Sequence, residues 1–376
     1  MRVINLTENT PGAEGCGYEH GLCFYIETEH HRLLMDTGQT DLFARNAEQL
    51  GIDLTLVDTV VISHGHYDHG GGLLHFARIN PGAKIYIRAS AFGPYYSIDS
   101  SGKPHYIGLA EGIRDLPGLV VIEDNSESGP EGNPKDNPEG NPEGNPEGNP
   151  KGNPEGNPEG NPEGSSGGSG EEKEPGIYRI DEELSLFSGI GMEHPIPSAN
   201  DRLKVETEAG LVQDDFRHEQ CLVIREGGRS VLLSGCAHHG ILNILDRYRT
   251  LYGGSPDVVF SGFHMMKRHG YSGSDLLMII DTALALKQTD TIFFTGHCTG
   301  QEPYEAMKKL MGDRLRYIHS GDKVLVMKES EKKAAERAAA LKTEKKRSSY
   351  MKSHKFFAWA TVACFLMTMW TGYKKK

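Results

Sequence analysis

Residues 63–72 have the sequence Ser63-His64-Gly65-His66-Tyr67-Asp68-His69-Gly70-Gly71-Gly72. This stretch follows residues 57–62, a short apolar run rich in β-branched side chains that is typical of a buried strand. Three imidazoles and a carboxylate so close together are ligands that suit Zn²⁺, with iron or manganese as alternatives. The glycines let the backbone pass close to such a site. We therefore predict a metal centre where this strand ends. His64 and His66 converge on one ion, and Asp68 and His69 project toward a second.

On both sides of this stretch the sequence alternates strand-like and helix-like segments in two blocks, residues 1–124 and 176–328. In the first block, residues 22–27 and 32–35 resemble a strand hairpin, and residues 41–50 have helical spacing that ends at Gly51. Both blocks place hairpins before strand–helix units. This order predicts an α/β fold in which two sheets are covered by helices on their outer faces.

A low-complexity segment, residues 125–175, separates the two blocks. Within residues 131–162 the unit Glu-Gly-Asn-Pro recurs eight times with minor variants. Proline at every fourth position removes a backbone donor each time, and the segment has no apolar side chains with which to build a core. We predict a disordered insertion in a surface loop that joins neighbouring strands, with a ligand-binding repeat as the alternative.

The C-terminal part of the chain consists of a basic linker, residues 329–355, and 18 uncharged residues at 356–373. As a helix, this uncharged run spans about 27 Å, roughly the thickness of a hydrocarbon core. It therefore predicts a membrane anchor, with an interfacial helix as the alternative. Lysine and arginine are in greater excess on its N-terminal side, which would keep the folded domain in the cytosol.

Composition excludes some classes of protein. Much of the net charge of -12 comes from acidic residues between positions 123 and 174, and no nucleic-acid footprint is evident. The six cysteines are scattered without a disulfide framework, and no cleavable N-terminal signal is visible. We therefore expect a reducing, cytoplasmic setting and a small-molecule partner. Nothing in the sequence indicates an oligomeric state.

The pattern His-x-His-x-Asp-His after an apolar strand resembles the signature of the metallo-β-lactamase superfamily. Asp36-Thr37-Gly38 resembles the first motif of that superfamily. Five segments also resemble its 7,8-dihydropterin-6-methyl-4-(β-D-ribofuranosyl)aminobenzene-5′-phosphate synthase branch: Glu19-His20-Gly21-Leu22, Asp36-Thr37-Gly38-Gln39, Ser234-Gly235-Cys236-Ala237-His238, Gly262-Phe263-His264 and Thr295-Gly296-His297-Cys298-Thr299-Gly300. The resemblance implies a four-layer αββα sandwich. It also implies a hydrolase or transferase that acts on a small, phosphorylated, pterin-like substrate through a metal-bound hydroxide.

The resemblance further implies two divalent metal ions with six protein ligands. The ligands expected are His64, His66 and His238 for the first ion, and Asp68, His69 and His297 for the second. His194 and His218 compete with His238 for its place, since each is also a histidine of the second block. No carboxylate occupies the usual bridging position, so Cys236 or a water-derived hydroxide is expected there.

Three residues have expected catalytic roles. Asp68 orients the nucleophile as well as binding metal, and Asp36 holds a ligand imidazole in the right tautomer. His264 contacts substrate or an oxyanion, although a core histidine is the simpler interpretation. His239 is expected to point away from the metals, and seven further histidines, His105 among them, are expected on the surface. Two other functions remain open, namely an iron-dependent redox enzyme of this fold and a non-catalytic, membrane-tethered metal sensor.

Overall fold

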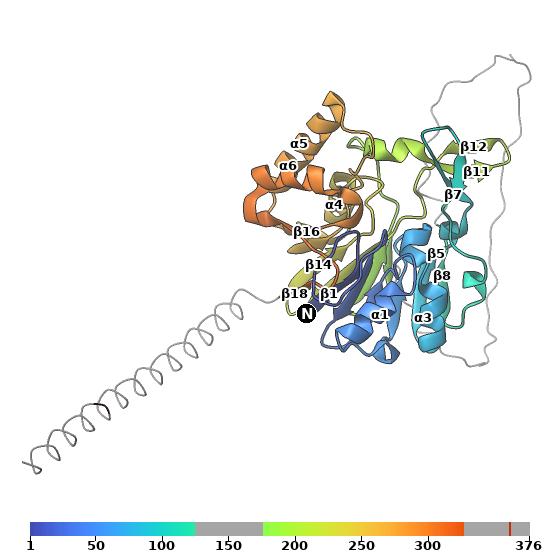
Figure 1. The fold of residues 1–376 in the computed structure, drawn as a ribbon, viewed down its shortest axis with the longest axis vertical. Coiled ribbons are helices and arrows are strands. Elements are labelled where there is room, and N and C mark those ends of the chain that lie inside the picture. Colours follow the sequence, from blue (N-terminus) through green and yellow to red (C-terminus); the bar gives the residue numbers. More distant parts are fainter. Residues whose placement is uncertain (125–175, 327–360, 362–376) are drawn as a thin grey trace, which may run out of the picture.

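Two seven-stranded sheets pack face to face at the centre of the computed structural model, which describes residues 1–124, residues 176–326 and Thr361 (Figure 1). The first sheet has the spatial order β18 (Lys323–Leu325), β1 (Arg2–Thr7), β2 (Cys23–Glu27), β3 (Arg32–Met35), β4 (Thr59–Val61), β5 (Lys84–Arg88) and β8 (Leu119–Ile122). The second has the order β17 (Leu315–Tyr317), β16 (Ile292–Thr295), β15 (Val258–Phe260), β14 (Arg229–Leu233), β13 (Cys221–Glu226), β10 (Leu184–Phe187) and β9 (Ile177–Arg179). Strand β18 thus returns from the end of the second block to pair with β1.

Alternation along the strands divides the buried side chains between two faces. In β2, Phe24 and Ile26 face the layer between the sheets, whereas Cys23 and Tyr25 face the opposite side. In β14, Leu232 likewise points away from the layer that its neighbours fill. A strand whose two faces are both apolar must be covered on both sides, which requires helices outside each sheet.

Helices provide this cover. Helices α1 (Leu42–Gln49) and α3 (Leu73–Ile79) cover the outer face of the first sheet, and α4 (Ile241–Tyr252), α5 (Gly273–Lys287) and α6 (Gln301–Met311) cover that of the second (Figure 1). Ser272 begins α5 with a capping box, because its side chain accepts from the Asp275 N–H while Asp275 accepts from the Ser272 N–H. The predicted four-layer αββα sandwich is confirmed.

A small third sheet was not predicted. It has the order β12 (Gly210–Gln213), β11 (Leu203–Thr207), β6 (Tyr95–Ile98) and β7 (Pro104–Tyr106). Strands β7 and β12 are exposed throughout, so they have none of the apolar alternation by which a strand is recognised in a sequence. Pairing of β6 with β11 depends on contact between segments about a hundred residues apart.

The parallel strands determine where the functional residues gather. Strands β3, β4 and β5 run parallel, as do β14, β15, β16 and β17. The carboxyl ends of parallel strands meet at one edge of a sheet, where crossover loops leave space for a ligand. The motif at residues 63–72 follows β4, and the segments that contain Cys236, His264 and His297 follow β14, β15 and β16.

Several predictions concern residues that the structure does not describe. The expected insertion at 125–175, the basic linker at 329–355 and the anchor segment at 356–373, Thr361 excepted, lie outside the described residues. The insertion connects β8 with β9, which are edge strands of the two different large sheets. Among the described residues there is no helix with the length and apolar character needed to cross a bilayer. The transmembrane prediction is corrected accordingly.

Phe260 tests the packing between the sheets. Its ring stacks on Phe294 at 4.8 Å and meets Phe24 of the first sheet edge-on at 5.7 Å. We expect Phe260→Ala to lower the free energy of unfolding by about 3–5 kcal/mol, because the cavity would open in a closed layer. Leu277→Ala is the control, because the Leu277 side chain on α5 is 61% exposed. This change should alter the free energy of unfolding by no more than about 0.5 kcal/mol. Urea unfolding measures both, and equal effects would contradict this account of the core.

Candidate metal centre

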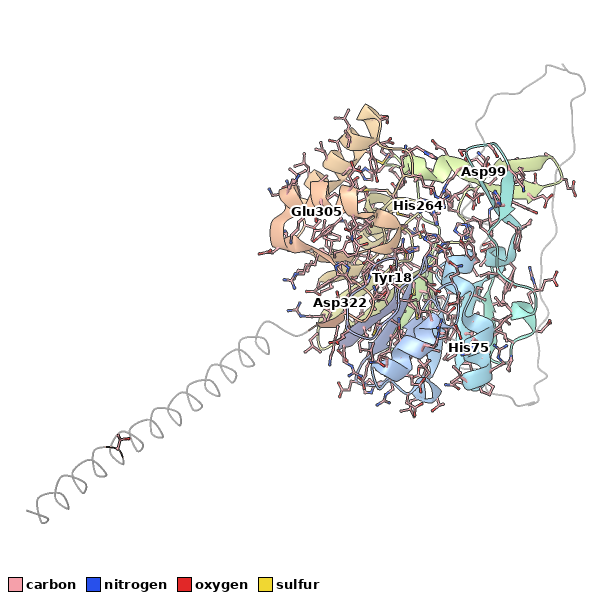
Figure 2. The ribbon with its side chains drawn as sticks, in the orientation of Figure 1. Tyr18, His75, Asp99, His264, Glu305 and Asp322 are labelled. Carbon is pink, nitrogen blue, oxygen red and sulfur yellow. The ribbon has the colours of Figure 1, made fainter. Side chains whose placement is uncertain are left out.

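The motif after β4 lies buried at the edge where the strand ends of both sheets meet. His66 precedes the single turn α2 (Tyr67–Gly70), which directs Asp68 and His69 to one side while His64 remains in the preceding loop. Figure 2 shows His264 in the upper middle of the molecule, and Asp99, beside the small third sheet, lines the same cavity. The edge therefore lies between the large sheets and the small one.

Four buried imidazoles have their Nδ1 atoms hydrogen-bonded to oxygen. The pairs are His64 with Ser63 Oγ at 2.8 Å, His69 with Asp36 Oδ2 at 2.6 Å, His238 with Asn200 Oδ1 at 2.9 Å and His297 with Asn9 Oδ1 at 2.8 Å. Ser63 gives its one hydroxyl proton to Asp36 at 2.7 Å, and carboxylate and amide oxygens only accept. Each Nδ1 is therefore the donor, and in the neutral ring each Nε2 offers a lone pair.

These Nε2 atoms converge in two pairs. His64 and His238 approach at 3.3 Å, and His69 and His297 at 3.2 Å. Lone pairs at this separation repel unless a proton or a cation lies between them. The arrangement therefore fits two cations, one at each pair, with the Nδ1 hydrogen bonds orienting the rings.

Other donors surround each pair. The His66 ring lies 4.6 Å from that of His64 and 5.0 Å from that of His238, between ring centres. The Asp68 carboxylate lies 3.3 Å from His297 Nε2 and 3.8 Å from His69 Nε2. The structure thus places five of the six predicted ligands in the two expected groups. The His66 ring lies beside the first pair, but its ligand atom is grouped with those of Asp214 and His218. Binding of metal by these residues stays a prediction.

The competitors for the place of His238 have other partners. His194 is partly exposed and bonds Asp246 at 2.8 Å. His218 is buried, but its Nδ1 accepts from the Gly65 N–H and its Nε2 bonds Asp214 at 3.1 Å, so neither nitrogen is free. His239 bonds Glu219 through its Nδ1 at 2.8 Å and belongs to neither group, as expected. Only His238 of these four points an Nε2 at His64.

Burial keeps most of these rings neutral. It lowers the pKa of His66 to about 3 and that of His297 to about 4. It also lowers the pKa of His64 and His238 well below the usual range. His69 differs. Burial alone would lower its pKa, but the Asp36 and Asp68 carboxylates outweigh that effect and raise the pKa to about 9. A cation at the second pair must therefore displace a proton from His69.

Several residues at the strand ends have left-handed backbone angles that favour glycine. They are Asp36 (φ 63°), Ala237 (φ 52°), His264 (φ 48°) and His297 (φ 49°). Such angles are uncommon for residues with side chains and persist where the surroundings impose them. Asp36 illustrates the reason, because its carboxylate accepts from the Ser63 N–H and hydroxyl, both at 2.7 Å, as well as from His69. The turn thus directs the carboxylate at the loop that carries the metal ligands.

A cavity of about 370 Å³ opens above the two groups of ligands. His264 lines it with both ring nitrogens buried and without a hydrogen-bond partner, and its ring centre lies 4.3 Å from that of His238. His264 is thus neither a packed core residue nor a surface one. A buried ring with two unused nitrogens implies a partner from outside the chain.

The cavity wall also contains residues that the sequence did not single out as functional. His20, in the loop before β2, places Nε2 3.2 Å from the Asp68 carboxylate. His105, expected on the surface, lines the cavity beside Asp99 at 2.7 Å. Arg202, at the end of the short helix Ser198–Arg202, and Arg268 line it too. None of these positions has a spacing signal, because each reaches the cavity only through the folding of a loop.

Arg202 and Arg268 are the two arginines that line the cavity. Burial lowers the pKa of the Arg202 guanidinium, and the nearby charge of Arg268 lowers it further. Within residues 1–124 and 176–326, neither arginine forms a hydrogen bond or an ion pair with the protein. Two like charges that repel each other beside a metal centre favour an anionic ligand.

Comparison with known proteins agrees with this geometry. The family model of the metallo-β-lactamase superfamily matches residues 16–174. An uncharacterised protein of Methanocaldococcus jannaschii is 24% identical over 299 residues, which cover 78% of this chain and 87% of that protein. The 7,8-dihydropterin-6-methyl-4-(β-D-ribofuranosyl)-aminobenzene-5′-phosphate synthase of the same organism is 24% identical over 340 residues, 85% of this chain and 95% of the synthase.

One solved structure shows the same fold. It is that of Tm1679, a metal-dependent hydrolase of the β-lactamase superfamily, which covers 87% of this chain and 100% of its own with a TM-score of 0.62 and 24% identity. The matched motif, the four-layer sandwich and the convergent imidazoles at its edge agree with one another. Residues 16–174 therefore match the metallo-β-lactamase superfamily, and the described part of the chain has the metallo-β-lactamase fold.

Proposed function

We propose that this protein is a dinuclear metal-dependent hydrolase or transferase that acts on a small phosphorylated substrate. The observation that carries the proposal is the convergence of four Nε2 atoms in two pairs, 3.2 and 3.3 Å apart, each ring oriented through Nδ1. His64, His66 and His238 would hold one ion, and Asp68, His69 and His297 the other. Zinc fits this set of imidazole and carboxylate donors, with iron or manganese as alternatives. When bound, two such ions polarise a substrate oxygen and lower the pKa of water.

The residues of the chain supply orientation and charge. Asp36 holds the Nδ1–H of His69 and so keeps its Nε2 directed at the centre. Burial alone would raise the pKa of Asp68, but His69, His20 and His297 outweigh it and hold that pKa well below the usual range. Asp68 is thus a carboxylate at neutral pH and can orient a nucleophile. Burial lowers the pKa of His264 well below the usual range, so its neutral ring can donate one hydrogen bond to a substrate oxygen.

The arginine pair supports a phosphorylated substrate. Guanidinium groups bind phosphate oxygens through paired hydrogen bonds, and among the described residues neither Arg202 nor Arg268 forms a hydrogen bond or an ion pair that would compete. A cavity of about 370 Å³ is large enough for a small molecule. Its apolar wall, which includes Tyr67, Ile107 and Met266, suits an aromatic body. The name of the synthase relative contains a pterin and a 5′-phosphate, which agrees with a pterin-like phosphorylated substrate.

Metal content tests the centre. We expect two transition-metal ions per chain by elemental analysis of protein purified without chelators. Asp68→Ala and His66→Ala should each lose metal and abolish hydrolysis of a phosphodiester without changing the circular dichroism spectrum. His30→Ala, in an exposed turn, is the matched control and should keep both ions. Wild-type protein without stoichiometric metal would overturn the proposal.

The arginine pair predicts a specific defect in binding. Removing a charged hydrogen-bond donor costs about 1.5–3 kcal/mol, so Arg202→Ala or Arg268→Ala should raise KM for a phosphorylated substrate about 10- to 100-fold. A lactone substrate without phosphate should be little affected by either change. Arg45→Ala, on the exposed surface of α1, serves as the control. An unchanged KM for the phosphorylated substrate would show that the arginines do not bind phosphate.

The pKa of His69 predicts how metal binding depends on pH. Below pH 9 the ring carries a proton that a cation must displace, so zinc affinity should fall as the pH falls from 9 toward 7. Asp36→Asn removes a carboxylate that raises this pKa, and the variant should release fewer protons on binding zinc at pH 8. Calorimetry in buffers of different ionisation enthalpy counts these protons, with the exposed Asp313→Asn as control. The same proton count in wild type and Asp36→Asn would contradict the role given to Asp36.

A further inference from the structure

We propose that the Cys236 sulfur is a ligand shared by both metal ions and bridges them as a thiolate. The inference rests on the proposed binding of two ions and adds the identity of the group between them. It also narrows the choice of metal, because a thiolate suits zinc or iron better than manganese.

Cys236 is the one residue common to both groups of convergent ligands. Its Sγ lies with the ligand atoms of His64 and His238 in one group and with those of His69 and His297 in the other, all within 4.8 Å of one another in each group. The distance from Sγ to His69 Nε2 is 3.2 Å. The Cys236 side chain is only 2% exposed, and it lies at the wall of the cavity beside both groups.

The backbone holds this cysteine in place. It follows β14 between Gly235 and Ala237, and a Cβ added at Gly235 would lie 2.2 Å from Ser63 Oγ of the first sheet. The Gly262 N–H bonds the Gly235 carbonyl at 2.8 Å, which ties the loop to the end of β15. On the other side of Cys236, Ala237 has a left-handed backbone conformation with a φ angle of 52°. Both neighbours are thus packed against strand ends, and Sγ has little freedom to move away.

Among the described residues, no carboxylate competes for the shared position. Asp36 faces the Nδ1 side of His69, away from the Nε2 atoms. Asp214 belongs to a separate group with His66 and His218 and bonds His218. Asp68 belongs to a group with His20 and His297 and is not grouped with the ligand atoms of the first pair. Sulfur is therefore the protein donor between the two pairs.

A second buried thiol provides the natural control. Cys298 accepts from the His264 N–H at 3.3 Å, and its Sγ lies 3.5 Å from the Cys236 carbonyl oxygen. It forms a group with Cys236 and His264 but belongs to neither pair of convergent imidazoles. Binding of the ions would release the Cys236 thiol proton to the buffer.

Cobalt-substituted protein tests the bridge by spectroscopy. With two Co²⁺ bound, wild type should show a near-ultraviolet sulfur-to-cobalt charge-transfer band. We expect Cys236→Ser to lose this band and Cys298→Ser to retain it. A band that survives in Cys236→Ser, or that disappears in Cys298→Ser, would overturn the assignment.

X-ray absorption of zinc-loaded wild-type protein tests the bridge without depending on whether a variant folds. A bridging thiolate gives each zinc a sulfur neighbour at about 2.3 Å, so the average is about one sulfur per zinc. A value near one half, meaning sulfur on one ion only, or no sulfur at all, would refute the bridge. If wild type fails to bind two ions, the proposed function itself fails. If it binds two ions without this sulfur signal, only the bridge is wrong.

Discussion

The buried Asp36 carboxylate is the interaction on which the rest of the site depends. It follows β3, and it accepts hydrogen bonds from the Ser63 backbone and hydroxyl at the end of β4 and from His69 in α2. Burying a carboxylate away from solvent costs free energy unless hydrogen-bond donors surround it. Here three donor atoms lie 2.6–2.7 Å from the Asp36 carboxylate oxygens. The same bonds orient two imidazoles, since Ser63, having donated to Asp36, can accept from His64.

The candidate metal centre also connects the two sheets. His64, His66, Asp68 and His69 come from loops of the first sheet, whereas His238 and His297 follow strands of the second. At the first pair the desolvated Nε2 lone pairs of His64 and His238 face each other at 3.3 Å, which is unfavourable unless a proton or a cation lies between them. Metal binding is then coupled to the packing of the sheets, because the ligands meet only when both are in place.

The small third sheet forms one wall of the cavity. Its strand β6 leads to Asp99, and Arg202 directly precedes β11, so the pairing of β6 with β11 closes one side of the cavity. The other side contains His264 and Arg268, which come from the loop after β15. The ligands are thus supplied by the ends of the large sheets, and the contacts that would select a substrate come from loops. This division is common where a rigid scaffold positions variable loops.

The sequence alone determined the layers and the motif after β4, because apolar alternation and closely spaced ligands are local signals. It also identified the six candidate ligands, but it left His194 and His218 open beside His238, since all three belong to the same block. Only the tertiary structure distinguished them, through the free Nε2 that His238 points at His64. Arg202, Arg268 and the third sheet were missed, and His20 lay in a recognised segment but was given no role. Each depends on contacts between segments far apart in the chain, which leave no periodic pattern in the sequence.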